Sequence, residues 1–513
     1  MSCRSVRELL RLRAALGDHV AYAAGREGRA LTYADLAAAA AGWADPLVEQ
    51  GLQPGNRVAL LLQDPLTFVP AYLGLVAAGF TIVPLNAEAP DAEWSRLAGM
   101  LGADVVVTDR ETVPDSFPRV WHATEGRLTE EVNRRGPARF AEPREQHGHV
   151  DAAVLLGSSG TTGAPKVVPL RESQLLYVAR RVAAHHRLGP DERGYSPLPL
   201  FHINAQVVGV LSTLVAGSSL VLDRRFHRTD FWPLLDSWNV TWLNAVPAIL
   251  AILARSEAPD ERTASRVRFA RSASAPLPRS VLERFQTHCG IPIVETYGMT
   301  EAAAQITANP VPPATPKPGS VGRPVGVDLR VVNGRRRPCA AGEIGSVEIR
   351  GPSVVRSYVR TEPNGGGHLR PARTPDGWLV TDDLGYLDED GFLFLVGRAD
   401  DVINRGGEKV YPKPVEDVLR AHPEVDQVAV VGRPDPVLGE TPVAYVTTDS
   451  SADRARLVSE LGALAASRLS ASDRPMRYLV VDGMPAGPTG KINRNRLAHL
   501  EVDAAAAVAA RAS

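Results

Sequence analysis

The sequence predicts an α/β protein with a large N-terminal domain of parallel sheets, helices and a small β subdomain, followed by a small C-terminal α+β domain. Two observations predict this architecture. The chain of 513 residues is longer than a single hydrophobic core supports, so at least two domains are expected. Segments of strand and helix length alternate from Leu31 onward, which is typical of parallel strands connected by helices, and the pattern restarts after Arg398. We therefore expect domains at 1–398 and 399–513.

The first alternating segment begins at Thr32, which can cap a helix because its hydroxyl accepts a hydrogen bond from the first turn. Pro54 and Gly55 then form a turn that leads into an apolar strand. In order, we expect a helix at 33–50, a strand at 57–62, a helix at 66–78 and strands at 81–83 and 105–108.

Two changes in composition mark the second half of the chain. Pro, Gly, Thr and Lys dominate 309–326, and the short strands and Gly turns at 329–349 predict a small β element. The stretch 362–377 is rich in Gly, Pro and Arg and is typical of a solvent loop. Beyond it we expect, in order, a helix at 414–421, strands at 427–431 and 443–447, a helix at 457–469 and an Ala-rich end from Val502 with little structural signal.

The composition excludes several classes of partner. Lys and Arg total 57 and Asp and Glu total 58, so no overall field exists to gather nucleic acid or anionic lipid. The longest strongly apolar stretch, 71–83, is too short to cross a bilayer, and 1–13 lacks the apolar segment of a secretory signal. The three cysteines are scattered without a CxxC pair. We expect a cytoplasmic protein with no nucleic acid partner and no membrane partner.

A loop rich in Gly and hydroxyl groups carries the strongest chemical signal. Its sequence SSGTTGAPK lies between an apolar run at 152–156 and a helix expected at 172–184, which predicts a strand-to-helix loop. Glycines let backbone N–H groups approach a phosphate, hydroxyls donate hydrogen bonds, and a lysine neutralises charge. The pattern is not the Walker motif, because its glycine and lysine are not adjacent. The predicted phosphate-binding residues are Ser158, Ser159, Gly160, Thr161, Thr162, Gly163 and Lys166.

Four further motifs follow in order: ETYGMTE at 295–301, TDD at 381–383, GRADD at 397–401 and PTGK at 488–491. Together with the loop they resemble the adenylate-forming superfamily of acyl-CoA synthetases, peptide-synthetase adenylation domains and firefly luciferase over nearly the whole chain. The resemblance implies an enzyme that uses ATP and Mg²⁺ to join a small-molecule acid to AMP, with release of pyrophosphate. The acyl group would then pass to a thiol acceptor such as CoA.

The resemblance also implies roles for single residues around the nucleotide. Tyr297 would stack on adenine, Thr300 would donate to the α-phosphate, and Glu301 would bind the magnesium ion. Asp383 would accept from both ribose hydroxyls, and Arg398 would contact the same sugar. The remaining residues implied at the nucleotide are the strand and turn at 271–275, with Ser272, Ala273 and Ser274, and the motif residues Glu295, Thr296 and Gly298.

Four features implied by the resemblance concern catalysis and transfer. Lys491 would be the catalytic cation, because attack of a carboxylate on phosphorus brings two anions together and a positioned ammonium stabilises that charge. Asp400 matches the hinge about which a mobile small domain would rotate between the two half-reactions, and Gly406 and Gly407 would present backbone to the acceptor thiol. His202 resembles the aromatic gate beside the acid pocket.

Three positions depart from the family pattern. Val167 and Ser357 stand where glycine is usual, and Asp382 replaces the glycine between the Thr and Asp of its motif. A carboxylate at this position would repel phosphate if it pointed inward, and we expect the turn to expose it. A non-catalytic homologue would be expected to lose Lys491 or Glu301, and both are present.

Within the superfamily, the chain resembles the oxalyl-CoA synthetase branch most, in the segments 168–170, 271–274, 299–301 and 404–408. That branch binds a very small, doubly charged acid with a serine and a histidine. Ser272 or Ser274 could supply the hydroxyl, but Ala303 and Ala304 occupy the stretch where the branch carries its histidine. Oxalate would then bury a second carboxylate without a cationic partner, so we expect it to be a poor substrate.

Three functions remain open on these residues. The first is an acid–CoA ligase for a small or medium carboxylic acid. The second is a diazotase-type ligase that activates nitrite with ATP and transfers it to an aryl amine, because a small anion pocket without a second carboxylate partner would suit nitrite. The third is a non-catalytic nucleotide-binding homologue, which would bind ATP without releasing pyrophosphate.

Overall fold

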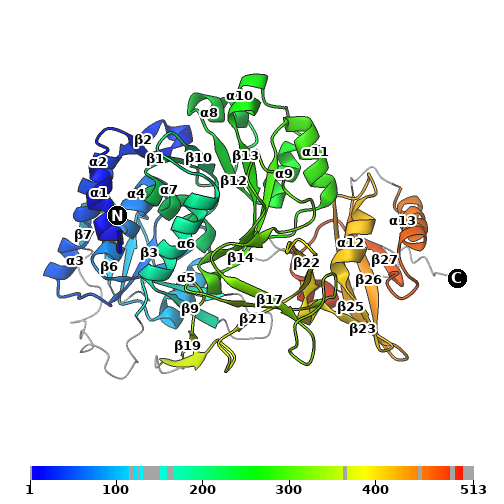
Figure 1. Cartoon of the computed structure of the whole chain (residues 1–513). Helices are drawn as coiled ribbons and strands as arrows, with labels where there is room; N and C mark the ends of the chain where they lie inside the picture. The colour runs from blue at the N-terminus through cyan, green and yellow to red at the C-terminus, as the bar shows by residue number, and fades with distance from the viewer. Residues whose placement is uncertain are drawn as a thin grey trace.

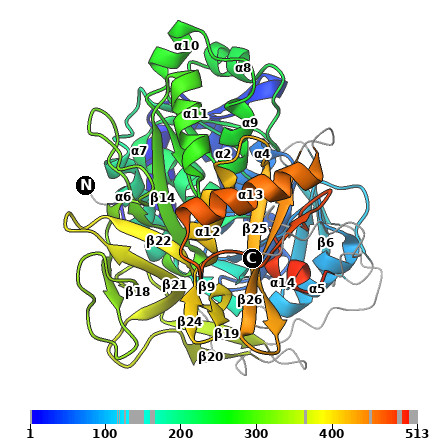
Figure 2. The same cartoon turned by 90° about the vertical axis from the view of Figure 1, so that its right-hand side faces the viewer.

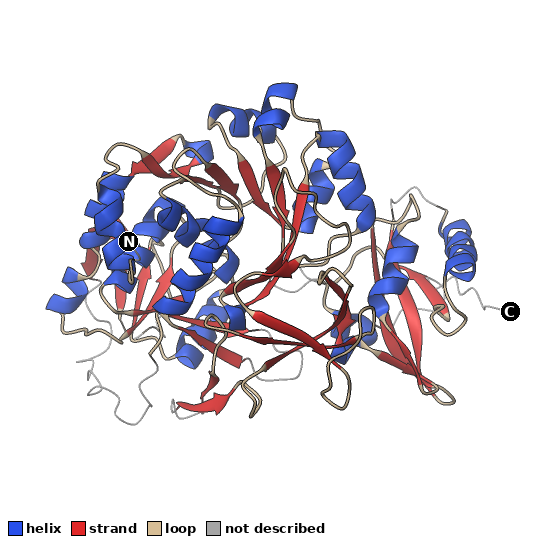
Figure 3. Cartoon of the chain, viewed as in Figure 1, coloured by secondary structure: helices blue, strands red, loops and turns tan. Residues whose placement is uncertain are grey.

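The computed structural model describes residues 3–114, 117, 119–124, 127–130, 151–158, 166–361, 367–448, 453–485 and 492–500. The strands of these residues form two nine-stranded sheets, a four-stranded sheet and a five-stranded sheet (Figures 1 and 3). The strands of the first three sheets end at or before Arg398, and those of the fourth follow it. The expected α/β class is therefore confirmed.

The first nine-stranded sheet has a parallel centre and antiparallel edges, in the order β16-β15-β14-β13-β12-β10-β11-β1-β2. Strands β14 to β1 of this order run parallel, and β15, β16 and β2 run antiparallel to their neighbours. Every residue of β11, β12 and β13 is buried, as expected for parallel strands with both faces covered. The strands are β1 Val20–Ala24, β2 Arg29–Thr32, β10 Arg193–Ser196, β11 Ser219–Leu222, β12 Trp242–Ala245, β13 Phe269–Ser272, β14 Ile293–Met299, β15 Ala304–Ala308 and β16 Arg323–Pro324.

The second nine-stranded sheet has the order β20-β19-β9-β8-β4-β3-β5-β6-β7. Its strands β8 to β6 run parallel, and the others are antiparallel to their neighbours. The strands are β3 Arg57–Leu61, β4 Thr81–Pro84, β5 Val105–Thr108, β6 Val120–Thr124, β7 Arg127–Glu130, β8 Val154–Ser158, β9 Lys166–Leu170, β19 Ser357–Thr361 and β20 Gly367–Pro371. The solvent loop expected at 362–377 is wrong in part, because β20 pairs with the open edge of β19.

The first expected helix is interrupted. Thr32 caps α2 (Tyr33–Ala41) as predicted, in a capping box with Asp35. The helix stops before Gly42, however, and a separate short helix α3 covers Asp45–Glu49. Glycine is a poor interior helix residue, and Pro46 cannot donate the N–H that one continuous helix would need. The prediction of a single helix over 33–50 is therefore wrong.

The remaining helices of the large part flank the sheets. Those expected at 66–78 and 172–184 are confirmed as α4 (Pro65–Ala77) and α6 (Glu172–His185). The others are α1 Val6–Ala14, α5 Asp91–Leu101, α7 Ser212–Ala216, α8 Phe231–Ser237, α9 Pro247–Leu253, α10 Glu261–Arg266, α11 Arg279–Cys289 and the 3-10 turns η1 Gly25–Glu27, η3 Thr300–Ala302 and η4 Ala399–Asp401. None of the described helices is long and apolar enough to span a bilayer.

The largest hydrophobic cluster joins the two nine-stranded sheets. It combines Trp242 and Phe269 of the first sheet with Val58 and Val168 of the second, and the buried face of α6 packs with them. The π-helical segment η2 (Ala205–Leu211) is buried along its whole length and contributes to the same cluster. Because both sheets contribute to this one core, residues of both sheets pack around the side chains of β13 that point into it.

The four-stranded antiparallel sheet, in the order β17-β18-β21-β22, confirms the small β element expected near 329–349. Its strands are β17 Asp328–Val332, β18 Gly345–Arg350, β21 Leu379–Leu387 and β22 Leu393–Arg398.

The five-stranded sheet carries two helices on one face (Figure 2). Val415 and Leu419 of α12 pack with Leu457 and Leu461 of α13 on the apolar side of β25 and β26. The helices and strands expected after Arg398 are thus confirmed. They are β23 Ile403–Arg405, β24 Glu408–Val410, α12 Pro412–Arg420, β25 Gln427–Asp435, β26 Gly439–Thr447, α13 Arg454–Arg468, β27 Arg477–Val480 and α14 Arg494–Ala498. The Ala-rich end from Val502 lies outside the described residues.

Candidate active site

The predicted phosphate loop connects two antiparallel strands. Ser158 ends β8 and Lys166 begins β9, and the two residues are paired across the strands. The prediction of a strand-to-helix loop is therefore wrong, because the β-branched pair at 167–168 continues as a buried strand before α6 begins. The loop residues Ser159, Gly160, Thr161, Thr162 and Gly163 lie outside the described residues, as does Lys491.

Three residues predicted at the adenine and ribose lie together at the meeting of two sheets. The Tyr297 hydroxyl, on β14, donates a hydrogen bond to the Asp383 carboxylate on β21. Arg398 ends β22 directly opposite Asp383, and their charged groups are 3.4 Å apart. Burial, and next the Asp383 charge, raises the pKa of Tyr297, so its hydroxyl remains a donor. An aromatic ring, a carboxylate and a guanidinium are thus held in one cluster.

Glu301, the predicted magnesium ligand, lies on η3 with only 7% of its surface exposed. The Tyr358 hydroxyl donates to its Oε1 at 3.3 Å, and the Lys166 ammonium lies 5.4 Å from the centre of the Tyr358 ring. Burial raises the pKa of Glu301, and the positive charges of Lys166 and Arg398 oppose that rise. The carboxylate therefore has cations nearby but no direct ion pair with them among the described residues.

Asp382, which replaces the glycine of its motif, lies in a turn between the two predicted cations of the nucleotide side. Its φ of 62° is in the left-handed region, which explains why glycine suits this turn. Its carboxylate lies 4.0 Å from Lys166 and 3.8 Å from Arg398, with 45% of the side chain exposed. The expectation that the turn exposes Asp382 is only half correct, because the side chain still reaches two cations of the nucleotide side.

A buried cation lies on the predicted acid side. Arg271, on β13, is 2% exposed, and its guanidinium donates to Asn204 at 3.2 Å, Asn244 at 3.0 Å and Gln305 at 3.4 Å. The sequence placed 271–275 against the adenine and expected no cation in the acid pocket. Arg271 is joined to the Ala303 and Ala304 stretch through Gln305, which directly follows it.

One of the other residues predicted around the acid pocket, Ser274, is linked to this arginine through Asn204. Asn204 donates to the Ser274 hydroxyl at 3.3 Å, while the buried Ser272 hydroxyl has no hydrogen-bond partner among the described residues. Ala303 and Ala304 are buried with φ values of 56° and 101°, so the chain is strained where it passes the pocket.

His202 lies at the entrance to η2. Its ring centre is 4.2 Å from that of Phe201, and its backbone N–H donates to the Pro199 carbonyl at 3.0 Å. The π-helical segment begins directly after Asn204. Such segments are rare and occur frequently at functional sites, so the location agrees with a gate beside the pocket.

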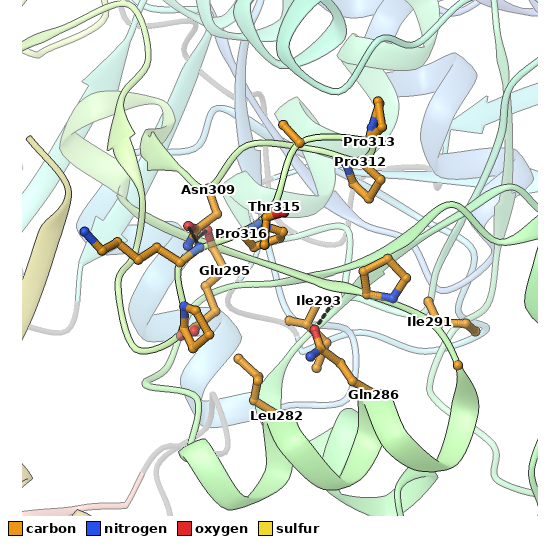
Figure 4. A pocket seen from close by; sticks show the side chains of 15 residues that line it. Leu282, Gln286, Ile291, Ile293, Glu295, Asn309, Pro312, Pro313, Thr315 and Pro316 are labelled. Carbon is orange, nitrogen blue, oxygen red and sulfur yellow. Dashed lines mark hydrogen bonds between the residues drawn. The ribbon is translucent and has the colours of Figure 1, made fainter. Parts of the chain in front are cut away.

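A cavity of about 490 Å³ opens beside Glu295, and the sequence did not predict it (Figure 4). Helix α11, the start of β14 and the Pro-rich stretch 312–318 line it. Burial raises the pKa of Glu295 to about 7, opposed by the Gly319 N–H and by Lys413 of α12. The Pro-rich composition of this stretch was visible in the sequence, but the burial of Glu295 was not.

Two predicted features belong to the C-terminal part. Asp400 lies in η4, between β22 and β23, where the chain passes from the large part to the small one. Gly406 and Gly407 form the two-residue turn between β23 and β24, with φ values of 59° and 94°. The positive φ values of this turn are sufficient to explain both glycines, so their presence is not evidence for or against an acceptor site there.

Metal ligands are sparse in the described part of the chain. No group of three or more His, Cys, Asp or Glu side chains lies there in an arrangement that could hold a metal ion. A magnesium ion bound by Glu301 would therefore need ligands from elsewhere, as Mg²⁺ usually does when it binds through one carboxylate and substrate phosphates.

The architecture matches a solved adenylate-bound enzyme. The o-succinylbenzoate CoA synthetase from Bacillus subtilis, in complex with its acyl-adenylate intermediate, superposes with a TM-score of 0.80 at 28% identity. The superposition covers 95% of this chain and 97% of that one. This match over almost the whole of both chains supports an adenylate-forming ligase fold.

Family matches identify the chain further. The AMP-binding enzyme family matches residues 11–359, and its C-terminal domain family matches residues 414–491, so the chain belongs to the AMP-binding enzymes. The sulfoacetate–CoA ligase of Cupriavidus necator is 34% identical over 92% of each chain. The oxalate–CoA ligase of Arabidopsis thaliana is 33% identical over 88% of this chain and 89% of its own. The resemblance to the oxalyl-CoA synthetase branch is thereby confirmed.

Proposed function

We propose that this enzyme activates a small organic acid with ATP and Mg²⁺, releases pyrophosphate, and transfers the acyl group from acyl-AMP to CoA. The observation that carries the proposal is the cluster of Tyr297, Asp383 and Arg398, which three separate strands bring beside Glu301. An aromatic ring for the adenine, a carboxylate that can accept hydrogen bonds from the ribose hydroxyls and a cation in that arrangement fit a nucleotide. The relatives named above, which are CoA ligases for sulfoacetate and oxalate, support the thiol acceptor.

The residues fit the proposed steps in a definite order. Lys166 and the loop before it would hold the triphosphate, and Glu301 would hold the magnesium ion that neutralises it. Lys491 would stabilise the charge as the acid oxygen attacks the α-phosphorus, and Thr300 would donate to the same phosphate. His202 would close the acid side.

Transfer to CoA is proposed to need a rearrangement of domains. We place the domains at 1–398 and 399–513, because η4 at Asp400 joins two units with separate hydrophobic clusters. The small domain would rotate at Asp400, removing Lys491 and bringing Gly406 and Gly407 toward the thiol.

The test is a coupled measurement on the full-length protein. With ATP, Mg²⁺ and a panel of small acids, we expect acid-dependent pyrophosphate release, followed by consumption of one CoA for each pyrophosphate. Nitrite with an aryl amine and without CoA is run in parallel. ATP binding without pyrophosphate release for any acid would contradict the proposal. If nitrite with the aryl amine were the one combination that is turned over, the acceptor would be an amine and not a thiol.

A further inference from the structure

Arg271 is a buried charge without an acidic partner. Its guanidinium contacts only the neutral side-chain oxygens of Asn204, Asn244 and Gln305, and its Nε has no hydrogen-bond partner. No Asp or Glu in the described part of the chain forms an ion pair with it. Burial lowers the pKa of Arg271 to about 9, so the group is still positively charged at neutral pH.

Buried charges in proteins are normally paired, because removing an ion from water is costly unless a counter-charge or a full set of hydrogen bonds replaces the water. Arg494 of this chain shows the usual solution, since it lies 2.6 Å from Glu416 and 3.5 Å from Asp401. Arg271 is more deeply buried than Arg494 and has neither. No described residue supplies the missing anion.

The surroundings of Arg271 favour an anion. His185 and His186 lie close enough that, after burial, the Arg271 charge is the next cause lowering their pKa values. The Nε2 group of Gln305, which is 2% exposed, is a second donor with no partner among the described residues. The two histidines are therefore neutral at pH 7, so Arg271 keeps its positive charge beside them and Gln305 offers a further donor.

A polar route connects Arg271 to the surface. Ser274 is exposed and accepts from Asn204, which is half-buried and accepts in turn from the Arg271 guanidinium. Both residues lie at the predicted acid side, next to His202 and η2. At its inner end, Arg271 contacts Gln305, four positions beyond Glu301 of the nucleotide side. Arg271 is thus linked through Gln305 to the segment that carries Glu301, and through Asn204 to the exposed Ser274.

We propose that Arg271 binds a second anionic group of the substrate, a carboxylate or a sulfonate, while the first carboxylate is activated. This inference rests on the proposed function and narrows it to short acids that carry two negative charges. Arg271 supplies the cation that Ala303 and Ala304 cannot, so the expectation that oxalate is a poor substrate loses its physical basis. Arg271 is a specificity-determining residue in this scheme.

Pairs of acids that differ only in the distal charge test the proposal. We compare malonate with malonamate and oxalate with oxamate in pyrophosphate release, and add sulfoacetate to separate sulfonate from carboxylate. The expected kcat/KM ratio is at least about 50-fold in favour of the dianion, as for a charged hydrogen-bonding pair. Equal use of a dianion and its amide by the wild type would overturn the proposal.

Variants then assign the preference to Arg271. In Arg271→Met we expect the dianion to lose about 50-fold in kcat/KM and the amide to lose little, while Arg271→Lys retains part of the preference. Arg268→Met, which removes a nearby arginine paired with Glu192 at 2.9 Å, is the matched control and should leave the ratio unchanged. An unchanged ATP affinity would show that Arg271→Met is folded. If the variant does not fold, the comparison of each dianion with its amide in the wild type still tests the proposal.

The outcomes separate this inference from the function beneath it. If only acetate, propionate or nitrite is activated, the enzyme is a ligase but Arg271 does not select a second anion. If Arg271→Met loses both members of each pair equally, Arg271 has a structural role and the inference is wrong. Absence of pyrophosphate release across the whole panel would contradict the proposed function and the inference together.

Discussion

Glu295 and Arg271 show how single side chains in this molecule acquire unusual properties by burial. Both lie on neighbouring strands of the first sheet, and neither forms an ion pair within 4 Å among the described residues. Burial raises the pKa of Glu295 to about 7, so this carboxyl is close to half-protonated at neutral pH. Burial of Arg271 instead leaves a charge that a ligand can neutralise. The consequence for Glu295 is a dependence of stability on pH.

We predict that Glu295→Gln stabilises the protein at pH 8. Because the folded pKa is about 7 and the ordinary value is 4.5, the folded state holds a proton that the unfolded state has lost between these values. The free energy of unfolding of the wild type therefore falls as pH rises from 4.5 to 7. The variant lacks this loss and should be more stable at pH 8 by about 2–3 kcal/mol, with little difference at pH 5.

Urea unfolding at both pH values measures this effect. Glu283→Gln on the same side of the sheet removes an exposed carboxylate of α11 and serves as the control, with no expected change in pH dependence. Equal stability of Glu295→Gln and wild type at pH 8 would show that the Glu295 carboxylate is well solvated.

We predict that Lys491→Ala reduces acid-dependent pyrophosphate release by about 100–1,000-fold, because a positioned charge no longer stabilises the transition state. ATP binding should survive, since Asp383 and Lys166 are unchanged. Single-turnover pyrophosphate release and nucleotide titration measure the two effects. Lys409→Ala, which removes an exposed lysine of the same domain, is the control. Near-normal release in Lys491→Ala would remove this residue from the mechanism.

At the scale of single elements, turns decide which side chains reach the nucleotide. The left-handed residue within β21 lets Asp382 turn toward Lys166 and Arg398, while Asp383 faces Tyr297. One strand thus directs successive carboxylates to different groups. Asp382 thus lies beside Lys166, which we propose for the triphosphate, and Arg398, which we propose for the ribose.

We predict that Asp382→Asn lowers the KM for ATP about fivefold, because removal of one half-exposed charge frees Lys166 for phosphate and Arg398 for the ribose. Asn tolerates the left-handed backbone, so the change isolates charge from conformation. Asp382→Gly should have a KM for ATP within twofold of that of Asp382→Asn. A rise in KM in the Asn variant would show instead that Asp382 helps to position the two cations.

At the scale of the whole molecule, charged groups link the two proposed domains among the described residues. Arg255 after α9 pairs with Asp426 at 2.8 Å, and both side chains are about half exposed. Lys413 of α12 is near enough to Glu295 to influence its pKa. Exposed ion pairs contribute little, so these contacts would not prevent a rotation at Asp400.

We predict that Asp400→Pro permits adenylation but blocks transfer, because proline fixes the backbone torsion at the pivot. Acyl-AMP should accumulate on the enzyme, and CoA consumption should fall by at least tenfold. Quenched-flow measurement of acyl-AMP and thioester follows both steps. Asp400→Ala keeps the torsion free and should retain both. Thioester formation at the wild-type rate in the proline variant would mean that the domains do not alternate about this residue.

The sequence alone determined the fold class, most elements and the enzyme family. Thr32 and its capping partner Asp35, for example, are three positions apart, so their interaction depends only on local geometry. Strands such as 105–108 were correct because an apolar, β-branched run has the same local preference in any fold. The errors at Gly42 and at β20 arose where a break or an edge pairing overrode a local pattern.

Only the tertiary structure revealed the surroundings of Arg271. Arg271 reaches Asn204, Asn244 and Gln305 across 67, 27 and 34 positions of sequence, so no local pattern could show that these oxygens surround it or that no carboxylate does. The cations beside Asp382 come likewise from β9 and β22. Local sequence specifies torsions and faces, whereas the partners and burial of a charge depend on where distant strands meet, and those decide what a charge in this protein can bind.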